Sequence, residues 1–235
     1  MKTPSLALHS STTRKLSRSF VLVCTAMLLA LCPASHAEVI WGLTTGGGVS
    51  KLFSVDSAAP ATSLSNTTIT GLATGFSLSG IDFRPSNGLL YGLAQNSNST
   101  QTRLYTINTS TSVATAVGGA QTRSLDYFGM AIDPINDVMR VINGNGFTGN
   151  YRIDLSTGVV TTDTPVAFVA GDPGITLGGV NIEGLAYTNP AGGASTLFGL
   201  SNVFSPSSDN RLYRIGDVNG APNSANTGRS TPLVR

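Results

Sequence analysis

The acidic side chains are the groups in this sequence best suited to carry out chemistry, and Asp82 and Glu183 stand out among them. Both lie on alternating segments that we expect to be the inner strands of repeated sheets. Two carboxyl groups that face each other across a cleft can hydrolyse a glycoside, one protonated and one ionised. The competing interpretation is structural, because Asp82 and Arg84 share one strand face and can pair with each other or with a neighbouring repeat.

A second group of charged residues surrounds the turn "DPIND". Asp133 and Asp137 flank this turn, and Arg140 follows on the next strand. An aspartate that caps the turn and an ion pair between repeats explain these residues structurally. A ligand-facing role for Arg84, Asp133, Asp137 and Arg140 is the alternative.

The segment "NGNGFTGN" at residues 143–150 is rich in glycine and asparagine. Its oxygens could bind calcium, a hard cation that needs no imidazole. The segment lacks the carboxylates of a strong calcium site. We therefore expect a plain loop and no cofactor, with calcium as the alternative.

The first 37 residues have the features of an export signal. Arg14, Lys15 and Arg18 precede an apolar run of 12 residues at 20–31, and small residues follow at 35–37. The run is shorter than the roughly 18 residues of a bilayer-spanning helix, so we expect cleavage and no stable membrane anchor. The sequence predicts a protein exported to the periplasm or to the cell exterior.

Removal of residues 1–37 would also remove every histidine and cysteine, which are His9, His36, Cys24 and Cys32. The remainder could not use a His-dependent triad, a Cys nucleophile, or a zinc or copper site built on imidazole or thiolate. Four of the 14 basic residues leave as well, so ten face 12 acidic residues. The remaining arginines are scattered, which argues against nucleic-acid binding.

Four short segments repeat along the chain at intervals of 50, 49 and 58 residues. They read "IWGL", "LYGL", "MRVI" and "LFGL", and their second residues are Trp41, Tyr91, Arg140 and Phe198. A phrase that contains a proline turn leads into three of them, as in "GIDFRPSNGLLYGL". Each such phrase begins with a glycine, which we expect where inner strands crowd together: Gly80, Gly129 and Gly184.

Other alternating segments, such as "RLYTIN" and "SVATAVG", complete each repeat. Four-stranded antiparallel units that recur every ~40–50 residues indicate a β-propeller. We therefore predict an all-β, propeller-like domain of about four blades at residues 38–215. The first unit lacks an inner strand, which a closed ring would take from the C-terminus. The tail at residues 216–235 offers only "TPLVR" as strand material, so we expect it to be divergent or truncated and the propeller incomplete there.

Five motifs in order carry a resemblance to a known family: "SGIDFRPSNGLLYGL", "RLYTINTSTSVATAVG", "FGMAIDPINDVMRVI", "YRIDLSTGVVTTDT" and "GLAYTNPAGGASTLFGL". They resemble the bacterial domain-of-unknown-function family 4394 (DUF4394) over residues 39–215. The resemblance implies an exported bacterial protein with a propeller-like fold and no assigned biochemical role. It carries over no catalytic residues.

The leading hypothesis is a non-catalytic binding or scaffold module whose partner is a protein, a glycan or a small molecule. A carboxylate-dependent hydrolase or lyase that acts on glycans is one alternative, and a structural surface or matrix protein is another. The aromatic residues Trp41, Tyr91 and Phe198 could stack on sugars. A repeated core contact is the simpler interpretation of their shared position.

Overall fold

The computed structural model describes residues 37–125, 128–143, 149–168, 180–188, 193–203, 211–221 and 223–234. Val39–Arg235 forms one compact unit. Its described part consists of antiparallel strands with two short 3₁₀ turns, η1 (Val218–Gly220) and η2 (Ala225–Thr227). None of the helices in these ranges is both long and apolar enough to cross a membrane.

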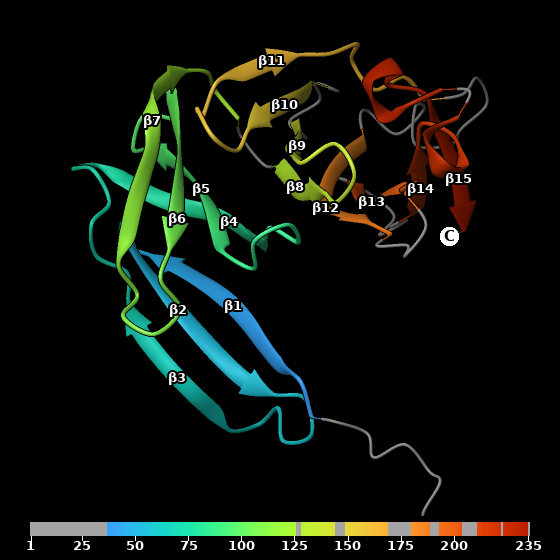
Figure 1. Ribbon diagram of the computed structural model, residues 1–235. Coiled ribbons are helices and arrows are strands. Elements are labelled where there is room, and N and C mark those ends of the chain that lie inside the picture. The colour runs from blue at the N-terminus through green and yellow to red at the C-terminus, as the bar shows by residue number, and fades with distance from the viewer. Residues whose placement is uncertain are drawn as a thin grey trace, which may run out of the picture. The chain divides into compact units, whose positions relative to one another are not determined.

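The strands form four successive sheets in a β-propeller arrangement, as predicted (Figure 1). The first blade holds β1 (Val39–Gly46), β2 (Val49–Asp56) and β3 (Ser63–Thr68), and the second holds β4 (Phe76–Phe83), β5 (Leu90–Asn96), β6 (Gln101–Ile107) and β7 (Ala114–Thr122). The third blade holds β8 (Phe128–Asp133), β9 (Val138–Asn143), β10 (Asn150–Asp154) and β11 (Val160–Thr162). The fourth holds β12 (Val180–Tyr187), β13 (Leu197–Val203), β14 (Leu212–Ile215) and β15 (Ser230–Val234).

The two ends of the propeller differ from each other. The first blade has three strands in the described residues and, as predicted, lacks the inner strand that β4, β8 and β12 supply elsewhere. The segment "TPLVR" does contribute a strand, β15, but β15 pairs with β14 and completes the fourth blade. The described residues therefore give the fourth blade four strands and the first blade three.

Residue pattern explains which strands are covered on one face and which on two. In β2, buried Ser50, Leu52 and Ser54 alternate with more exposed neighbours, as in a strand with one packed face. In β5, five consecutive residues are buried, because blades cover both faces of this strand. The continuous apolar run "LYGLA" is the sequence counterpart of that double burial.

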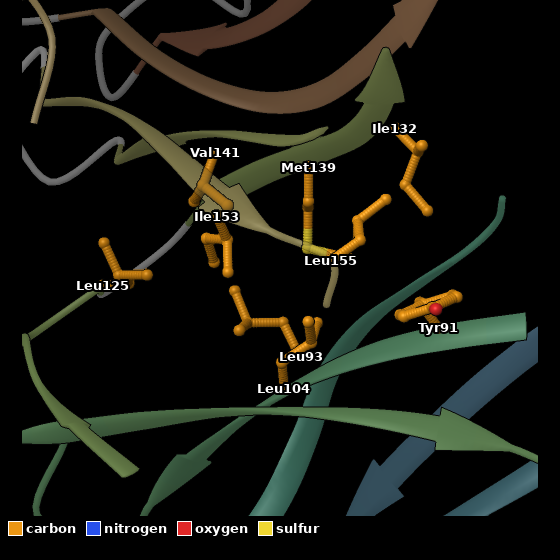
Figure 2. Packing of buried hydrophobic residues seen from close by; sticks show 9 residues of the cluster. All are labelled: Tyr91, Leu93, Leu104, Leu125, Ile132, Met139, Val141, Ile153 and Leu155. Carbon is orange, nitrogen blue, oxygen red and sulfur yellow. The ribbon is translucent and has the colours of Figure 1, made fainter. Parts of the chain in front are cut away.

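Three apolar clusters occupy the junctions between blades. The cluster between the second and third blades contains residues of β5, β6, β8, β9 and β10 (Figure 2). One further cluster joins the first blade to the second, and another joins the third to the fourth. Burial of each leucine in these clusters contributes about 1.5–3 kcal/mol, so the junctions hold the blades together.

The repeated aromatic position belongs largely to this packing. Tyr91 is buried in the second–third cluster, and Trp41 packs against the first–second cluster. Phe198 is half-buried. The prediction of a repeated core contact is therefore confirmed for Tyr91 and Trp41.

Gly129 marks the closest approach of two inner strands. A Cβ atom at this position would lie 2.9 Å from Leu185 Cγ and 3.0 Å from the carbonyl carbon of Gly184. β8 therefore packs against β12 only without a side chain here. The crowding expected at the leading glycines is confirmed for Gly129, whereas a Cβ atom at Gly184 would make only an ordinary contact of 3.5 Å with Leu200.

Replacement of Gly129 by alanine should destabilise the fold, because either β8 or β12 must shift to admit the methyl group. We expect a loss of about 1–3 kcal/mol in the free energy of unfolding, measured by urea denaturation. Gly46→Ala is the matched control, since a Cβ atom there has no neighbour within 4 Å. Equal stability of the two variants would contradict the close approach of β8 and β12.

Candidate functional site

A cleft of about 480 Å³ lies at the junction of the third and fourth blades. Its wall on the third blade comes from the β8–β9 turn, β9 and β10. The fourth blade contributes residues of β12, the start of β13 and both 3₁₀ turns. The predicted candidates Asp133 and Arg140 line this cleft, together with Arg152, Tyr187, Ser195 and Asn226.

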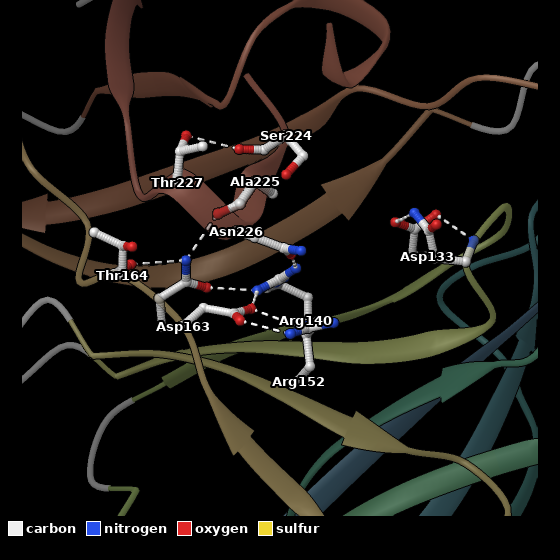
Figure 3. A network of polar contacts seen from close by, with 11 residues as sticks. Asp133, Arg140, Arg152, Asp163, Thr164, Ser224, Ala225, Asn226 and Thr227 are labelled. Carbon is white, nitrogen blue, oxygen red and sulfur yellow. Dashed lines mark hydrogen bonds and ion pairs between the residues drawn. The ribbon is translucent and has the colours of Figure 1, made fainter. Parts of the chain in front are cut away.

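Arg140 forms the floor of the cleft. It is one of the largest fully buried side chains, with a relative exposure of 2%. Its Nη1 donates to Asn150 Oδ1 at 2.9 Å and to Asp163 Oδ2, and its Nη2 donates to Asn226 Oδ1 (Figure 3). The buried charge is therefore held by partners from both blades.

Asp163 serves two guanidinium groups at once. Besides Arg140, it accepts two hydrogen bonds of 2.8 Å from Arg152 Nε and Nη2 (Figure 3). Its carboxylate is buried, whereas Arg152 is partly exposed. The two arginines therefore share one negative charge, and this arrangement fixes the direction of both side chains.

Asn150 connects this network to the fourth blade. Its Nδ2 donates to the backbone oxygen of Thr164 at 3.1 Å and to that of Ala225 at 2.8 Å. Its Oδ1 accepts from Arg140, so the same amide group holds both η2 and the buried guanidinium in place. The cleft floor is thus rigidly preorganised.

Asp133 caps the turn on the opposite side of the cleft, as predicted. Its Oδ1 accepts from the backbone N–H of Ile135 at 2.9 Å and of Asn136 at 3.2 Å, and its Oδ2 accepts from Asn136 Nδ2 at 2.8 Å. Ser195 Oγ, from the fourth blade, donates to Oδ1 at 3.1 Å. This carboxylate is saturated with donors, which suits a structural role.

Two buried polar atoms in the cleft wall have no hydrogen-bond partner of good geometry among the described residues, Arg140 Nε and Tyr187 Oη. Tyr187 nevertheless interacts with both charged neighbours. Burial raises the pKa of Tyr187 to about 12, the charge of Arg140 and hydrogen bonding to it oppose that rise, and the charge of Asp133 and hydrogen bonding to it add to the rise. The Tyr187 hydroxyl therefore stays neutral, with the Asp133 carboxylate as an acceptor beside it.

The other predicted arginine and aspartate meet outside this cleft. Arg84 forms an ion pair with Asp137 of the next blade, with Nε donating to Oδ1 at 2.8 Å and Nη2 binding Oδ2. Arg84 Nη1 also donates to the Tyr91 hydroxyl at 3.0 Å. The ion pair between repeats is thus confirmed, and hydrogen bonding to Arg84 holds the pKa of Asp137 below its ordinary value of 3.8.

The two predicted acidic residues do not share a cleft in the described residues. Asp82 lines a separate pocket of about 280 Å³ where the inner strands meet. Its carboxylate accepts from the backbone N–H of Ile132 at 2.7 Å and of Phe83 at 2.8 Å. Of the two structural partners considered, it thus contacts the neighbouring blade rather than Arg84. Glu183 lies at a β-bulge of β12, is exposed, and lines neither space.

Comparison with known families identifies the chain. Residues 51–231 match the family described as "Domain of unknown function (DUF4394)". The chain belongs to this family. The sequence matches no curated protein.

Some solved structures are similar to this DUF4394 chain at low identity. Exo-β-1,3-galactanase from Phanerochaete chrysosporium with galactose is 12% identical, with 83% of this chain and 49% of that chain covered and a TM-score of 0.47. Dipeptidyl peptidase 4 of Porphyromonas gingivalis is 14% identical, with 78% and 23% covered and a TM-score of 0.38. The DUF4394 chain thus spans less than half of the length of either structure.

Several residues of the DUF4394 cleft were not singled out from the sequence: Asn150, Arg152, Asp163, Tyr187, Ser195 and Asn226. Arg140 gave the one available signal, since it occupies the position that Trp41, Tyr91 and Phe198 fill in the other repeats. Most of the segment considered for calcium, residues 144–148, lies outside the described residues. In the part of the chain that the structure describes, no three His, Cys, Asp or Glu side chains come together as metal ligands.

Replacement of Asp163 by asparagine should strongly destabilise the DUF4394 domain, because Arg140 would remain buried without a carboxylate. We expect a loss of about 3–5 kcal/mol, seen as a lower thermal unfolding temperature. Asp56→Asn is the control, since Asp56 accepts from Ala58 N in an exposed turn. An unfolding temperature equal to that of the control would show that the shared carboxylate is dispensable.

The ion pair of Arg84 with Asp137 should give a pH-dependent contribution. Because the pKa of Asp137 is lowered in the folded state, this contribution is present above the ordinary pKa and lost as pH falls through the folded value. Asp137→Asn should cost at most about 1 kcal/mol near neutral pH, since the carboxylate is 39% exposed. Asparagine also tolerates the positive φ of 54° at this position.

The difference between wild type and Asp137→Asn should therefore shrink in urea denaturation as the pH falls from about 7 to about 3. Arg84→Met combined with Asp137→Asn should cost less than the sum of the two single changes. A pH-independent difference would contradict an ionic contribution from Asp137.

Proposed function

We propose that the protein is an exported, non-catalytic binding module of the periplasm or cell exterior. In this proposal, the cleft between the third and fourth blades holds a small polar ligand. The signal-like segment at residues 1–37 supports export. The single observation that supports the binding role is the buried Arg140 network at the cleft floor.

A buried ion pair is a costly way to stabilise a fold. Apolar side chains of similar size often serve stability equally well or better. The other three repeats do place an aromatic residue at the position of Arg140. A charge in this one blade, in the wall of this cleft, is therefore better explained by recognition than by packing.

The charges around the cleft favour a neutral ligand. Two arginines and two aspartates line the cleft: Arg140 and Arg152 with Asp133 and Asp217. Because these charges balance, neither an anion nor a cation gains a large advantage. The unpartnered N–H of Arg140 calls for an acceptor oxygen.

A neutral saccharide fits this combination best. Its hydroxyl oxygens accept hydrogen bonds, and its hydroxyl protons can be donated to the asparagine and serine side chains that line the cleft. Arg140 Nε is covered, so sugar binding requires a rearrangement that admits a sugar oxygen to it. Such a contact would remove the cost of one unsatisfied donor, about 1–3 kcal/mol.

The hydrolase alternative requires two carboxyl groups across one cleft. Asp82 and Glu183 line no common space in the described residues, and Asp133 is saturated by its own turn. These observations favour binding over glycoside hydrolysis. Measurement of turnover remains the direct comparison between the two functions.

Neutral saccharides should raise the thermal unfolding temperature of the protein, since a ligand at about 100 times its dissociation constant stabilises by about 2.7 kcal/mol. The probes are glucose, galactose, mannose and N-acetylglucosamine with their disaccharides, and galacturonate as the charged comparison. Tyr187→Phe should weaken binding of the active sugar by about tenfold, because it removes one donor.

Tyr151→Phe is the matched control, since Tyr151 packs against the second–third cluster outside the cleft. Binding that is unchanged in Tyr187→Phe, or no stabilisation by any saccharide, would contradict the proposal. Release of reducing ends that is abolished by Asp82→Asn or Glu183→Gln would replace it with the hydrolase. Self-assembly without sugar binding would favour the matrix protein.

A further inference from the structure

The pocket around Asp82 lies where three inner strands meet, and of its lining residues only Tyr187 also lines the cleft that contains Arg140. Equivalent residues from β4, β8 and β12 line the Asp82 pocket. The register shows the equivalence, because Asp82 pairs with Tyr91, Ala131 with Arg140, and Ala186 with Phe198. These pairs join the second residue after each leading glycine to the repeated aromatic position.

This equivalence exposes an exception within the repeat. Two of the three equivalent positions hold alanine, Ala131 and Ala186, and the third holds Asp82. The two small side chains leave open space beside the carboxylate. We call this space the axial pocket. It contains one charged side chain, Asp82, and two small ones, Ala131 and Ala186.

Apart from Asp82 and Tyr187, the residues that line the axial pocket are apolar, but several of their side chains pack into the clusters between blades, and polar atoms share the exposed lining. The other lining residues of the pocket are Ile81, Phe83, Pro85, Met130, Ile132, Pro134, Leu185 and Tyr187. Among these described residues, Tyr187 is the only titratable one apart from Asp82, and no basic residue occurs.

Asp82 has no cationic partner in the described part of the chain. Both of its contacts are backbone N–H groups, and each carboxylate oxygen keeps further acceptor capacity. Arg84, two residues along, is occupied by Asp137 and Tyr91. Burial without a counter-ion raises the pKa of Asp82, while the two backbone hydrogen bonds oppose that rise.

We propose that the axial pocket binds an alkylammonium group, with the Asp82 carboxylate as its counter-ion and the small side chains of Ala131 and Ala186 beside its alkyl chain. A hard metal ion suits this pocket less well, because calcium requires six to eight oxygen ligands. A primary ammonium needs fewer acceptors and gains from apolar surroundings on its carbon side. The ammonium belongs either to a free amine or to a lysine side chain.

Calorimetric titration of the full chain tests this proposal with four probes: n-butylammonium, Nα-acetyl-lysine methylamide, n-butanol and calcium chloride. Binding of n-butylammonium or the lysine derivative, but not of n-butanol, is the expected result, and the tighter of the two identifies the source of the ammonium. Asp82→Asn should weaken that binding by about tenfold or more, since a charge-assisted hydrogen bond is lost. Asp56→Asn is the matched carboxylate control.

Ala186→Leu provides a second variant that leaves the carboxylate in place. Ala186 is exposed at the pocket, so the larger side chain should fill the space without entering a packed core. Abolished ammonium binding in this variant supports the site even if Asp82→Asn fails to fold. Equal binding of n-butanol, calcium binding that displaces the ammonium, or full affinity in Ala186→Leu would each overturn the proposal.

Discussion

Burial of apolar side chains between successive blades is the interaction on which the rest of this structure depends. The mature part predicted from the sequence has no cysteine to cross-link it, so its blades are joined by packing and by backbone ladders. Each junction holds one cluster of buried residues, and the inner strands approach closely enough at Gly129 to exclude a side chain. This packing fixes the distances at which polar groups from different blades can meet. The Arg140 network and the Asp82 pocket both lie at such meeting points.

Both proposed sites are departures from the repeat. An arginine replaces the aromatic residue in the third blade, and an aspartate replaces the alanine in the second. In the second blade the exceptional residue is Asp82 on the inner strand, which pairs with Tyr91. In the third blade it is Arg140 on the second strand, which pairs with Ala131. A repeated scaffold makes such changes tolerable, because neighbouring blades still supply the packing that the altered position gives up.

The sequence predicted the fold well because the signals for it are local. Alternation and turn residues define each strand, and the repeat of "YGL"-like segments defines the blades. The turn cap at Asp133 was also within reach, since it depends on the residues of one turn. An ion pair between repeats was expected for Asp137, but its partner Arg84, 53 residues away along the chain, was not named. The pairing partner of β15 could not be predicted, because only tertiary packing decides whether this strand pairs with β14 or with the first blade.

The cleft network was beyond sequence analysis for a related reason. Arg140 reaches Asp163 and Asn226, which are 23 and 86 residues away along the chain. No spacing rule connects residues on different blades. The departure of Arg140 from the aromatic position was visible in the sequence, but its partners were not.

The three-stranded first blade gives the domain an uneven resistance to opening. Val39 and Ile40 of β1 are about half exposed, and β3 is exposed along most of its length. In the described residues, this blade packs only on the second, so it can detach while the other two junction clusters stay intact. Backbone amides of β1 and β3 should then exchange with solvent through partial opening, and those of β9 only through global unfolding. The first blade should therefore unfold before the central blades.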